Sequence, residues 1–274
     1  MSSSATLDSA SNNRALVLSA APTAGIFQIA LRDISTLFRT PWIIISRSLA
    51  FIIQLFVFAA LISNLVHIPT DPSLNFFQYY AIGSVVGTMA SISFIIGYDI
   101  FEEAEEGVLD YLLTLPVSRR QFIVGRALGG AVRAMIYIIP MFVIVAALER
   151  FANPLNLAAA IIDLFLLSFG VTGLSITVAV SVRSANRFDV VLALLELAVS
   201  RASTALYPLV AMPTYVAALA PFSPVSLAAN TARDALTGAG LNVAGFAGLI
   251  AFVVIFLGLG AAFYFRKLEG GVYA

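Results

Sequence analysis

The side chains that could make contacts outside a lipid bilayer are concentrated between residues 99 and 126. This segment reads DIFEEAEEGVLDYLLTLPVSRRQFIVGR and carries four glutamates followed by three arginines. The whole chain is 60% hydrophobic and only 11% charged, so a charged run of this kind must serve something outside the lipid. Carboxylates and guanidinium groups can pair with a charged partner surface or with lipid phosphates. We therefore expect this segment to contact another molecule.

The first half of the segment is predicted to form a short amphipathic helix after a corner. Gly107 permits a change of direction behind the glutamates. Leu109, Leu112 and Leu113 then line one face at helical spacing. Pro116 ends the helix, because proline cannot continue it.

A second helix is predicted to start immediately afterwards. Ser118 and Gln121 have the spacing of a capping box. Arg119 and Arg120 fall in the first turn, where they oppose the helix dipole at a cost of about 0.3 kcal/mol or more each, so an acidic partner or lipid phosphates explain them better than helix stability does. A solvated loop that obeys the positive-inside rule would explain the arginines but not the glutamates, since acidic residues have little influence on topology.

The sequence lacks the residues that would hydrolyse a nucleotide or hold a metal by itself. A phosphate-binding P-loop needs Gly-Lys followed by Ser or Thr, and the only lysine, Lys267, stands between Arg266 and Leu268. There is no cysteine, and no metal ligands accompany the sole histidine, His67. A net charge of zero gives no footprint for nucleic acid. Any ATP-driven activity therefore takes its energy from another polypeptide.

Three ionisable residues fall inside apolar stretches, namely Asp163, Glu196 and Arg201. A charge at the centre of a bilayer costs about 2.5 to 3.5 kcal/mol on insertion scales, so each should face the protein interior or a partner. A proton-coupled carrier could use them. Glu196 and Arg201 are five residues apart, however, which suits one helical face poorly, and Asp163 lies only about 9 Å from the end of its apolar stretch. We favour structural pairing or snorkelling.

The elements that position these residues are membrane-spanning helices. The mean hydropathy of +0.97 and the long apolar blocks indicate a bilayer as the solvent, in which a spanning helix needs about 20 apolar residues. The sequence predicts an all-α membrane protein with six spans, the fifth being the weakest on hydropathy. Their ranges are 49–66, 79–101, 127–148, 157–180, 188–207 and 243–265.

The distribution of basic residues predicts the orientation. With the amino terminus inside, twelve basic residues face the cytoplasm and three do not, so both termini and the charged segment are cytoplasmic. The twelve are Arg14, Arg32, Arg39, Arg47, Arg119, Arg120, Arg126, Arg133, Arg183, Arg187, Arg266 and Lys267, and the three are Arg150, Arg201 and Arg233.

An amphipathic helix is predicted before the first span. Between residues 25 and 40 apolar side chains recur at helical spacing, with Arg32, Asp33 and Arg39 on the other face. Pro41 and Trp42, a turn residue and an interfacial aromatic, follow directly, which suits a helix in the headgroup plane. A packed soluble helix is the alternative.

The segment between the fifth and sixth spans must bend repeatedly. It contains Pro208, Pro213, Pro221 and Pro224, too many for one uninterrupted helix. Backbone that is not helical can lie at membrane depth only when protein shields it or when it borders a watery cavity.

Together these features resemble the permease subunits of ABC-2 type transporters, over nearly the whole chain. The most specific similarity is EEGVLDYLLTLPVSRRQFIVGR between the second and third spans. The interfacial helix, the six spans and the proline-rich segment APFSPVSLAANTARDAL before the last span add to it.

The resemblance implies a coupling helix at 106–115 that sits in a groove of a separate cytoplasmic ATPase subunit. The residues expected at or beside that contact are Glu106, Gly107, Leu109, Tyr111, Leu112, Leu113, Pro116, Arg119 and Arg120. The segment with the four prolines would form re-entrant helices in the outer leaflet.

The resemblance also implies the organisation and partners of the chain. The expected partners are the ATPase, which would bind ATP and magnesium, a second permease protomer of the same or a related kind, and membrane lipid; this chain would bind no cofactor and perform no catalysis. The setting would be a prokaryotic plasma membrane. The expected parts are a disordered cytoplasmic tail (1–24), the interfacial helix (25–41), the six-span domain (42–266, with a coupling region at 102–126 and an outer region at 208–241) and a cytoplasmic tail (267–274).

The expected function is export of an amphipathic or hydrophobic substrate such as a drug, a lipid or a lipid-linked glycan. Two alternatives stay open at this stage. One is an ion-gradient-driven secondary carrier that uses Asp163, Glu196 and Arg201, and the other is a membrane scaffold without transport.

Overall fold

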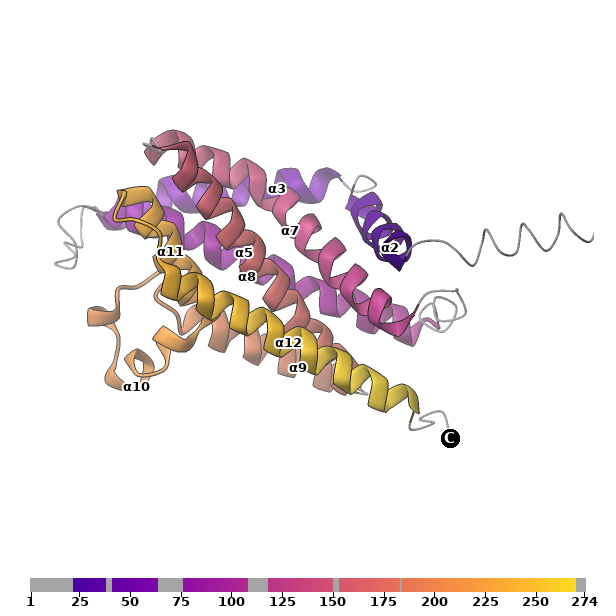
Figure 1. The fold of residues 1–274 in the computed structure, drawn as a ribbon. Helices are drawn as coiled ribbons and strands as arrows, with labels where there is room; N and C mark the ends of the chain where they lie inside the picture. Colours follow the sequence, from indigo (N-terminus) through magenta and orange to yellow (C-terminus); the bar gives the residue numbers. More distant parts are fainter. Residues whose placement is uncertain are drawn as a thin grey trace, which may run out of the picture.

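The computed structural model describes residues 22–37, 41–63, 76–107, 118–149, 153–182 and 184–269. Over these residues the chain is helical and contains no strand. Four helices are long and apolar enough to cross a membrane, which confirms an all-α multi-pass membrane protein. They are α5 (Phe76–Glu105), α7 (Arg119–Glu149), α8 (Pro154–Ser181) and α12 (Val243–Glu269), and Figure 1 shows them as the long rods of the bundle.

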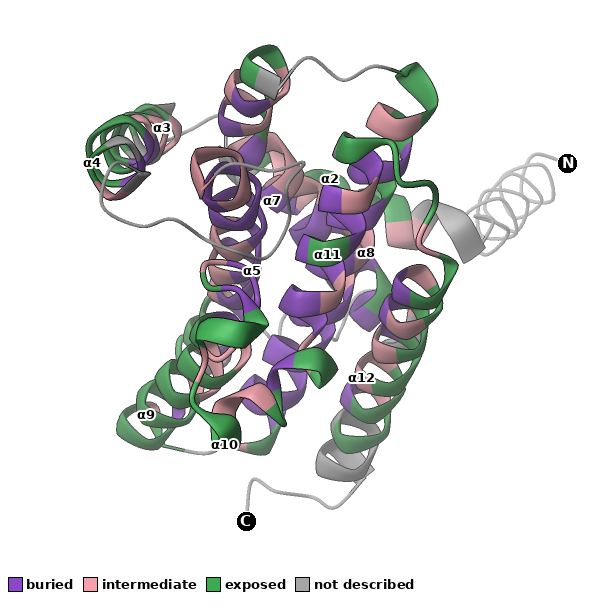
Figure 2. Ribbon diagram, turned by 90° about the vertical axis from the view of Figure 1, so that its left-hand side faces the viewer, coloured by how far each residue is buried: buried purple, intermediate pink, exposed green. Residues whose placement is uncertain are grey.

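Helix α8 forms the centre of the bundle and packs against α5, α7, α12 and α11 (Pro224–Thr237). Figure 2 shows α8 and α11 largely buried, whereas α12 turns an exposed face outward. Hydroxyl groups join α8 to α5, because Ser93 and Ser168 share a hydrogen bond of 2.7 Å and Ser175 donates to the carbonyl of Phe94 at 2.6 Å. Small residues and interhelical hydrogen bonds of this kind hold helices together where lipid removes the hydrophobic driving force.

The amino-terminal part consists of α2 and of a broken helix that follows it. Helix α2 lies at the same end of the bundle as the carboxyl end of α12 (Figure 1). It begins at Pro22, so the tail predicted for 1–24 is too long by three residues; proline is well tolerated in the first helical turn. The bounds are α2 (Pro22–Leu37), α3 (Pro41–Ile53), the π-helix η1 (Gln54–Ala59) and α4 (Ala60–Ser63).

The first predicted span corresponds to α3, η1 and α4. The helix starts at Pro41, eight residues before the predicted span. As in α2, proline is well tolerated in the first helical turn. Trp42 in its first turn is 76% exposed. The last residues of the predicted span, 64–66, lie outside the described part of the chain.

The fifth predicted span corresponds to α9 (Ala185–Glu196) and the π-helix η2 (Leu197–Arg201). Near its start Phe188 stacks on Phe101 of α5 with ring centroids 4.5 Å apart. Beyond its end the carbonyl of Ala205 lies against Gly83 of α5. Gly83 and Phe101 are 18 residues apart on one helix, or about 27 Å, so this element runs along α5 for nearly the thickness of a hydrocarbon layer.

The proline-rich segment bends repeatedly, as its composition predicts. Each proline stands just before or within the first turn of a short helical piece, where its missing N–H costs nothing. The pieces are η3 (Leu209–Ala211) after Pro208, α10 (Thr214–Ala217) after Pro213, η4 (Ala220–Phe222) with Pro221 as its second residue, and α11 with Pro224 as its first.

Candidate functional site

The predicted coupling segment lies mostly outside the described residues, which stop at Gly107 and resume at Ser118. Helix α5 ends in an exposed turn at Glu106 and Gly107, and Gly107 has a φ of 74°, a conformation that glycine adopts without strain. The capping box is present, since the N–H of Ser118 donates to Oε1 of Gln121 at 2.8 Å and the N–H of Gln121 donates to Oγ of Ser118 at 3.3 Å. Leu109, Tyr111, Leu112, Leu113, Pro116 and the side chains of Arg119 and Arg120 are among the residues not described.

Four charged residues from three helices form what we call the charged junction: Arg32 and Asp33 of α2, Glu103 of α5 and Arg126 of α7. Arg126 pairs with Asp33 and also with Glu103, at 3.0 Å from Nη2 to Oε2. Arg32 pairs with the other oxygen of Glu103. The junction therefore joins the last turns of α5 and the first turns of α7 to α2.

The centre of the charged junction is buried. Arg126 is 2% exposed and Asp33 is 4% exposed. Burial raises the pKa of Asp33, while the positive charge of Arg126 opposes that rise. Each charge in such a buried pair depends on its partner, since removing one leaves the other uncompensated. The pairing of Arg133 with Asp99, two helical turns further along α7, extends the same α5–α7 contact with greater exposure.

Close packing of α2 on α7 accompanies the charged junction. A Cβ at Gly129 would lie 2.9 Å from Cα of Ala30 and 3.0 Å from Oδ2 of Asp33. Real Cβ atoms need more room than this, so only glycine lets the two backbones approach so closely. The small residue at this position is therefore part of what holds α2 in place.

The Gly129→Ala substitution is expected to destabilise the protein by about 1 to 3 kcal/mol, because the added methyl group forces α2 away from α7. Gly258→Ala on α12 is the matched control. A Cβ there meets nothing within 4 Å, so this change should be neutral or slightly stabilising. Unfolding of the two variants in detergent, followed by circular dichroism, checks the difference. Equal unfolding free energies would show that the close approach of α2 is not needed.

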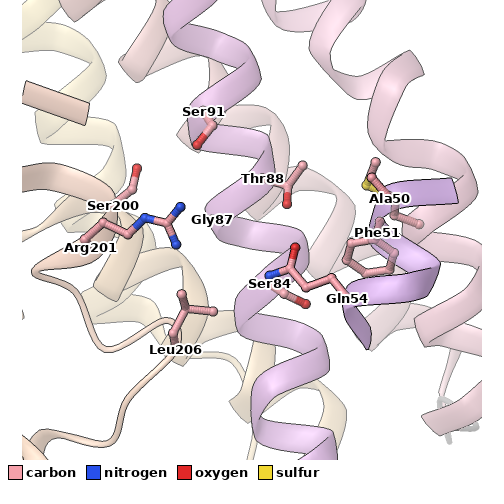
Figure 3. A pocket seen from close by; sticks show the side chains of 11 residues that line it. Ala50, Phe51, Gln54, Ser84, Gly87, Thr88, Ser91, Ser200, Arg201 and Leu206 are labelled. Carbon is pink, nitrogen blue, oxygen red and sulfur yellow. The ribbon is translucent and has the colours of Figure 1, made fainter. Parts of the chain in front are cut away.

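A second polar feature lies beside α5. It is a cavity of about 230 Å³ between η1, α5 and η2. Figure 3 shows Arg201 extending toward α5 from one side and Gln54 extending toward Ser84 of α5 from the other. We call it the polar cavity and define it by Gln54, Ser84, Thr88, Ser91, Ser200 and Arg201. Both flanking elements are π-helices, which occur frequently at functional sites.

The three charges predicted inside the membrane do not come together. Arg201 lies in the polar cavity. Asp163 is fully buried in α8, and neither of its carboxyl oxygens has a hydrogen-bond partner among the described residues. Glu196, at the end of α9, is half-buried, and the ion pairs found in the described part of the chain include none of the three. Structural pairing among them is therefore not seen, and neither is a shared ion path.

Another arginine, Arg233, connects several elements at the other end of the bundle. It is 5% exposed and its guanidinium lies 3.5 Å from the ring centroid of Tyr79. It donates to the carbonyls of Thr204 at 3.0 Å, of Tyr79 at 3.1 Å and of Ala205. It also donates to Oδ1 of Asn230 at 3.2 Å. Arg233 thereby joins α11, the start of α5 and the chain after η2.

The sequence alone does not predict the partners of most of these residues. The sequence predicts Asp33 on the polar face of an amphipathic helix. It distinguishes Arg126 from Arg233 only by whether the residue faces the cytoplasm. One signal was available for the polar cavity, because Ser84, Thr88 and Ser91 recur at helical spacing within an apolar span.

Comparison with known proteins gives one match. A family model described as ABC-2 type transporter matches residues 25–237, well over half of the chain. The matched range includes the charged junction, the polar cavity and the proline-rich segment through α11. No curated protein matches the chain.

Proposed function

This chain belongs to the ABC-2 type transporter family, and from that premise we propose that it is an export permease driven by a separate ATPase subunit. Membership in the family makes the chain a transmembrane permease domain and not a catalytic one. The finer proposal is that residues 106–116 dock into the ATPase. ATP and magnesium would be bound on that partner.

The observation that carries the proposal is the charged junction. It fixes the helices on both sides of residues 106–118 to each other and to α2, through the contacts of Arg126 with Asp33 and Glu103. A push on the coupling segment would therefore move α5, α7 and α2 as one body instead of bending the loop. Separating Arg126 from Asp33 would be costly, because each buried charge would be left uncompensated.

We assign α3–η1–α4 as the first span and α9–η2 as the fifth, which gives six spans with both termini in the cytoplasm. Two protomers would enclose the translocation path, and residues 208–241 would cap it on the outer side. The substrate would be amphipathic or hydrophobic, because exposed apolar side chains border the polar cavity. Substrates of this kind include drugs, lipids and lipid-linked glycans.

Leu112→Asp is expected to abolish copurification of the ATPase while leaving membrane insertion intact, because a carboxylate on the apolar face of the coupling helix cannot enter an apolar groove. The control is Leu155→Asp, at an exposed position in the first turn of α8. Affinity purification of the tagged permease from native membranes, with detection of a P-loop polypeptide in the eluate, measures the effect. If Leu112→Asp and Leu113→Asp both retain the ATPase at the level of the control, the coupling assignment is wrong.

A further inference from the structure

Arg201 is a cation for which the described part of the chain provides no paired carboxylate. It lies at the end of η2, its side chain is exposed, and none of the ion pairs formed by the described residues includes it. The element that carries it runs along α5, from Phe188 beside Phe101 to Ala205 beside Gly83. A guanidinium at such a depth is costly unless an anion or water meets it.

The groups around Arg201 are hydroxyls that can each form a further hydrogen bond. The hydroxyls of Thr88 and Ser91 form no hydrogen bond with other described residues, and Oγ of Ser200 is buried without a partner. Figure 3 shows the guanidinium of Arg201 extending from η2 toward α5 beside Gly87. A planar fork of N–H donors flanked by hydroxyls matches the oxygen atoms of a phosphate or a carboxylate.

The surroundings of the polar cavity are apolar. Leu194 and Leu197 precede Arg201 on the same helical face and are 60% and 57% exposed. On α5, Tyr98 lies two helical turns beyond Ser91 on the same face and is 46% exposed. The cavity of about 230 Å³ is smaller than the usual pocket for a drug-sized ligand. It can hold a head group, while a tail lies along the apolar surface beside it.

We propose that the polar cavity binds the acidic head group, a phosphate or a carboxylate, of an amphipathic molecule, and that Arg201 supplies the charge contact. This inference rests on the proposed function and specifies its substrate class as anionic amphiphiles. Thr88, Ser91 and Ser200 complete the contact as hydroxyl donors. The apolar tail lies against Leu194 and Leu197.

The test is equilibrium binding to the full-length permease in a neutral detergent, without ATP and without the ATPase. The probes are fluorescently labelled phosphatidic acid and phosphatidylcholine with identical acyl chains, and the variants are Arg201→Gln, Arg201→Lys and Arg187→Gln. Arg187 is an exposed arginine at the start of the same helix and serves as the matched control. Because no nucleotide or partner takes part, a failure here does not count against ATPase coupling, and a failure of copurification does not affect this measurement.

The wild type is expected to bind the anionic probe roughly tenfold more tightly than the zwitterionic probe, the gain of one charge-assisted contact. Arg201→Gln should remove this preference, Arg201→Lys should keep part of it, and Arg187→Gln should keep all of it. Millimolar inorganic phosphate should not displace the bound probe. The inference is overturned if the wild type itself shows no preference, if Arg201→Gln keeps the preference, or if inorganic phosphate competes as well as the amphiphile.

Discussion

Arg126→Ala is expected to destabilise the protein by about 3 to 5 kcal/mol, the usual cost of removing one partner from a buried ion pair. Arg126 is the only member of the charged junction that contacts carboxylates on two different helices. Without it the buried carboxylate of Asp33 loses the charge that opposes its desolvation, so the pKa of Asp33 should rise further. Unfolding of the purified variant in mixed micelles measures the loss.

Two further variants separate the buried pair from charge in general. Arg133→Ala removes an arginine from the same helix, but its partner Asp99 has a side chain that is 32% exposed, so the loss should be about 1 kcal/mol or less. The double variant Arg126→Met with Asp33→Leu replaces the buried pair by apolar groups and should recover much of the stability. A double variant as unstable as Arg126→Ala would show that the pair is not the cause.

The same variants test the role of the charged junction in coupling. Arg126→Met with Asp33→Leu should restore folding but weaken the connection of α7 to α5, because the contact of Arg126 with Glu103 is still missing. The pairs Arg32–Glu103 and Arg133–Asp99 remain. We therefore expect the ATPase to copurify with this variant while substrate no longer stimulates ATP hydrolysis. Normal stimulation would place the transmission of force elsewhere in the chain.

Local properties of the sequence were sufficient to predict most of the helices. A spanning helix is recognised by the length and hydropathy of one continuous segment, and this identified α5, α7, α8 and α12. The capping box at Ser118 and Gln121 is equally local and is present. The proline positions predicted the breaks between η3 and α11, since each proline removes a donor from the backbone.

Long-range pairing is what the sequence could not show. The capping box at Ser118 predicts the start of the helix that leads into the third span, and α7 begins at Arg119. Hydropathy places the apolar part of this helix from Ala127 onward and says nothing of the partners of Arg126. Arg126 is accommodated inside the bundle by Asp33, which is 93 residues away in the chain. Only the crossing of α2 over α7 brings these residues together, and no periodicity within either helix encodes that crossing.

The fifth span also depends on long-range contacts that hydropathy does not show. Glu196 and Arg201 made this segment the weakest prediction, and α9 by itself is too short to cross a bilayer. Its continuation through η2 along α5 became visible only from the contacts of Phe188 and Ala205 with that helix. Arg201 lowers the hydropathy of the segment because it is charged, and the structure places it in the polar cavity.

Arg233→Met is expected to destabilise the protein by about 3 kcal/mol and to weaken the wall of the polar cavity. The variant keeps the length of the side chain but removes the guanidinium donor from the carbonyls of Tyr79, Thr204 and Ala205. Thr204 keeps the hydroxyl of Tyr79 as a donor, and a buried group left unsatisfied costs about 1 to 3 kcal/mol. Hydrogen-deuterium exchange should increase after η2, where Leu206 lines the cavity.

The geometry of the guanidinium, and not only its charge, should matter at this position. Arg233→Lys keeps the cation but cannot reach three carbonyls and the ring of Tyr79 with one ammonium group, so we expect about half of the loss. Arg187→Met, at an exposed site, should change stability by less than about 0.5 kcal/mol. If Arg233→Lys unfolds like the wild type, charge alone suffices. In that case the fork of hydrogen bonds from α11 is not what joins the start of α5 to the chain after η2.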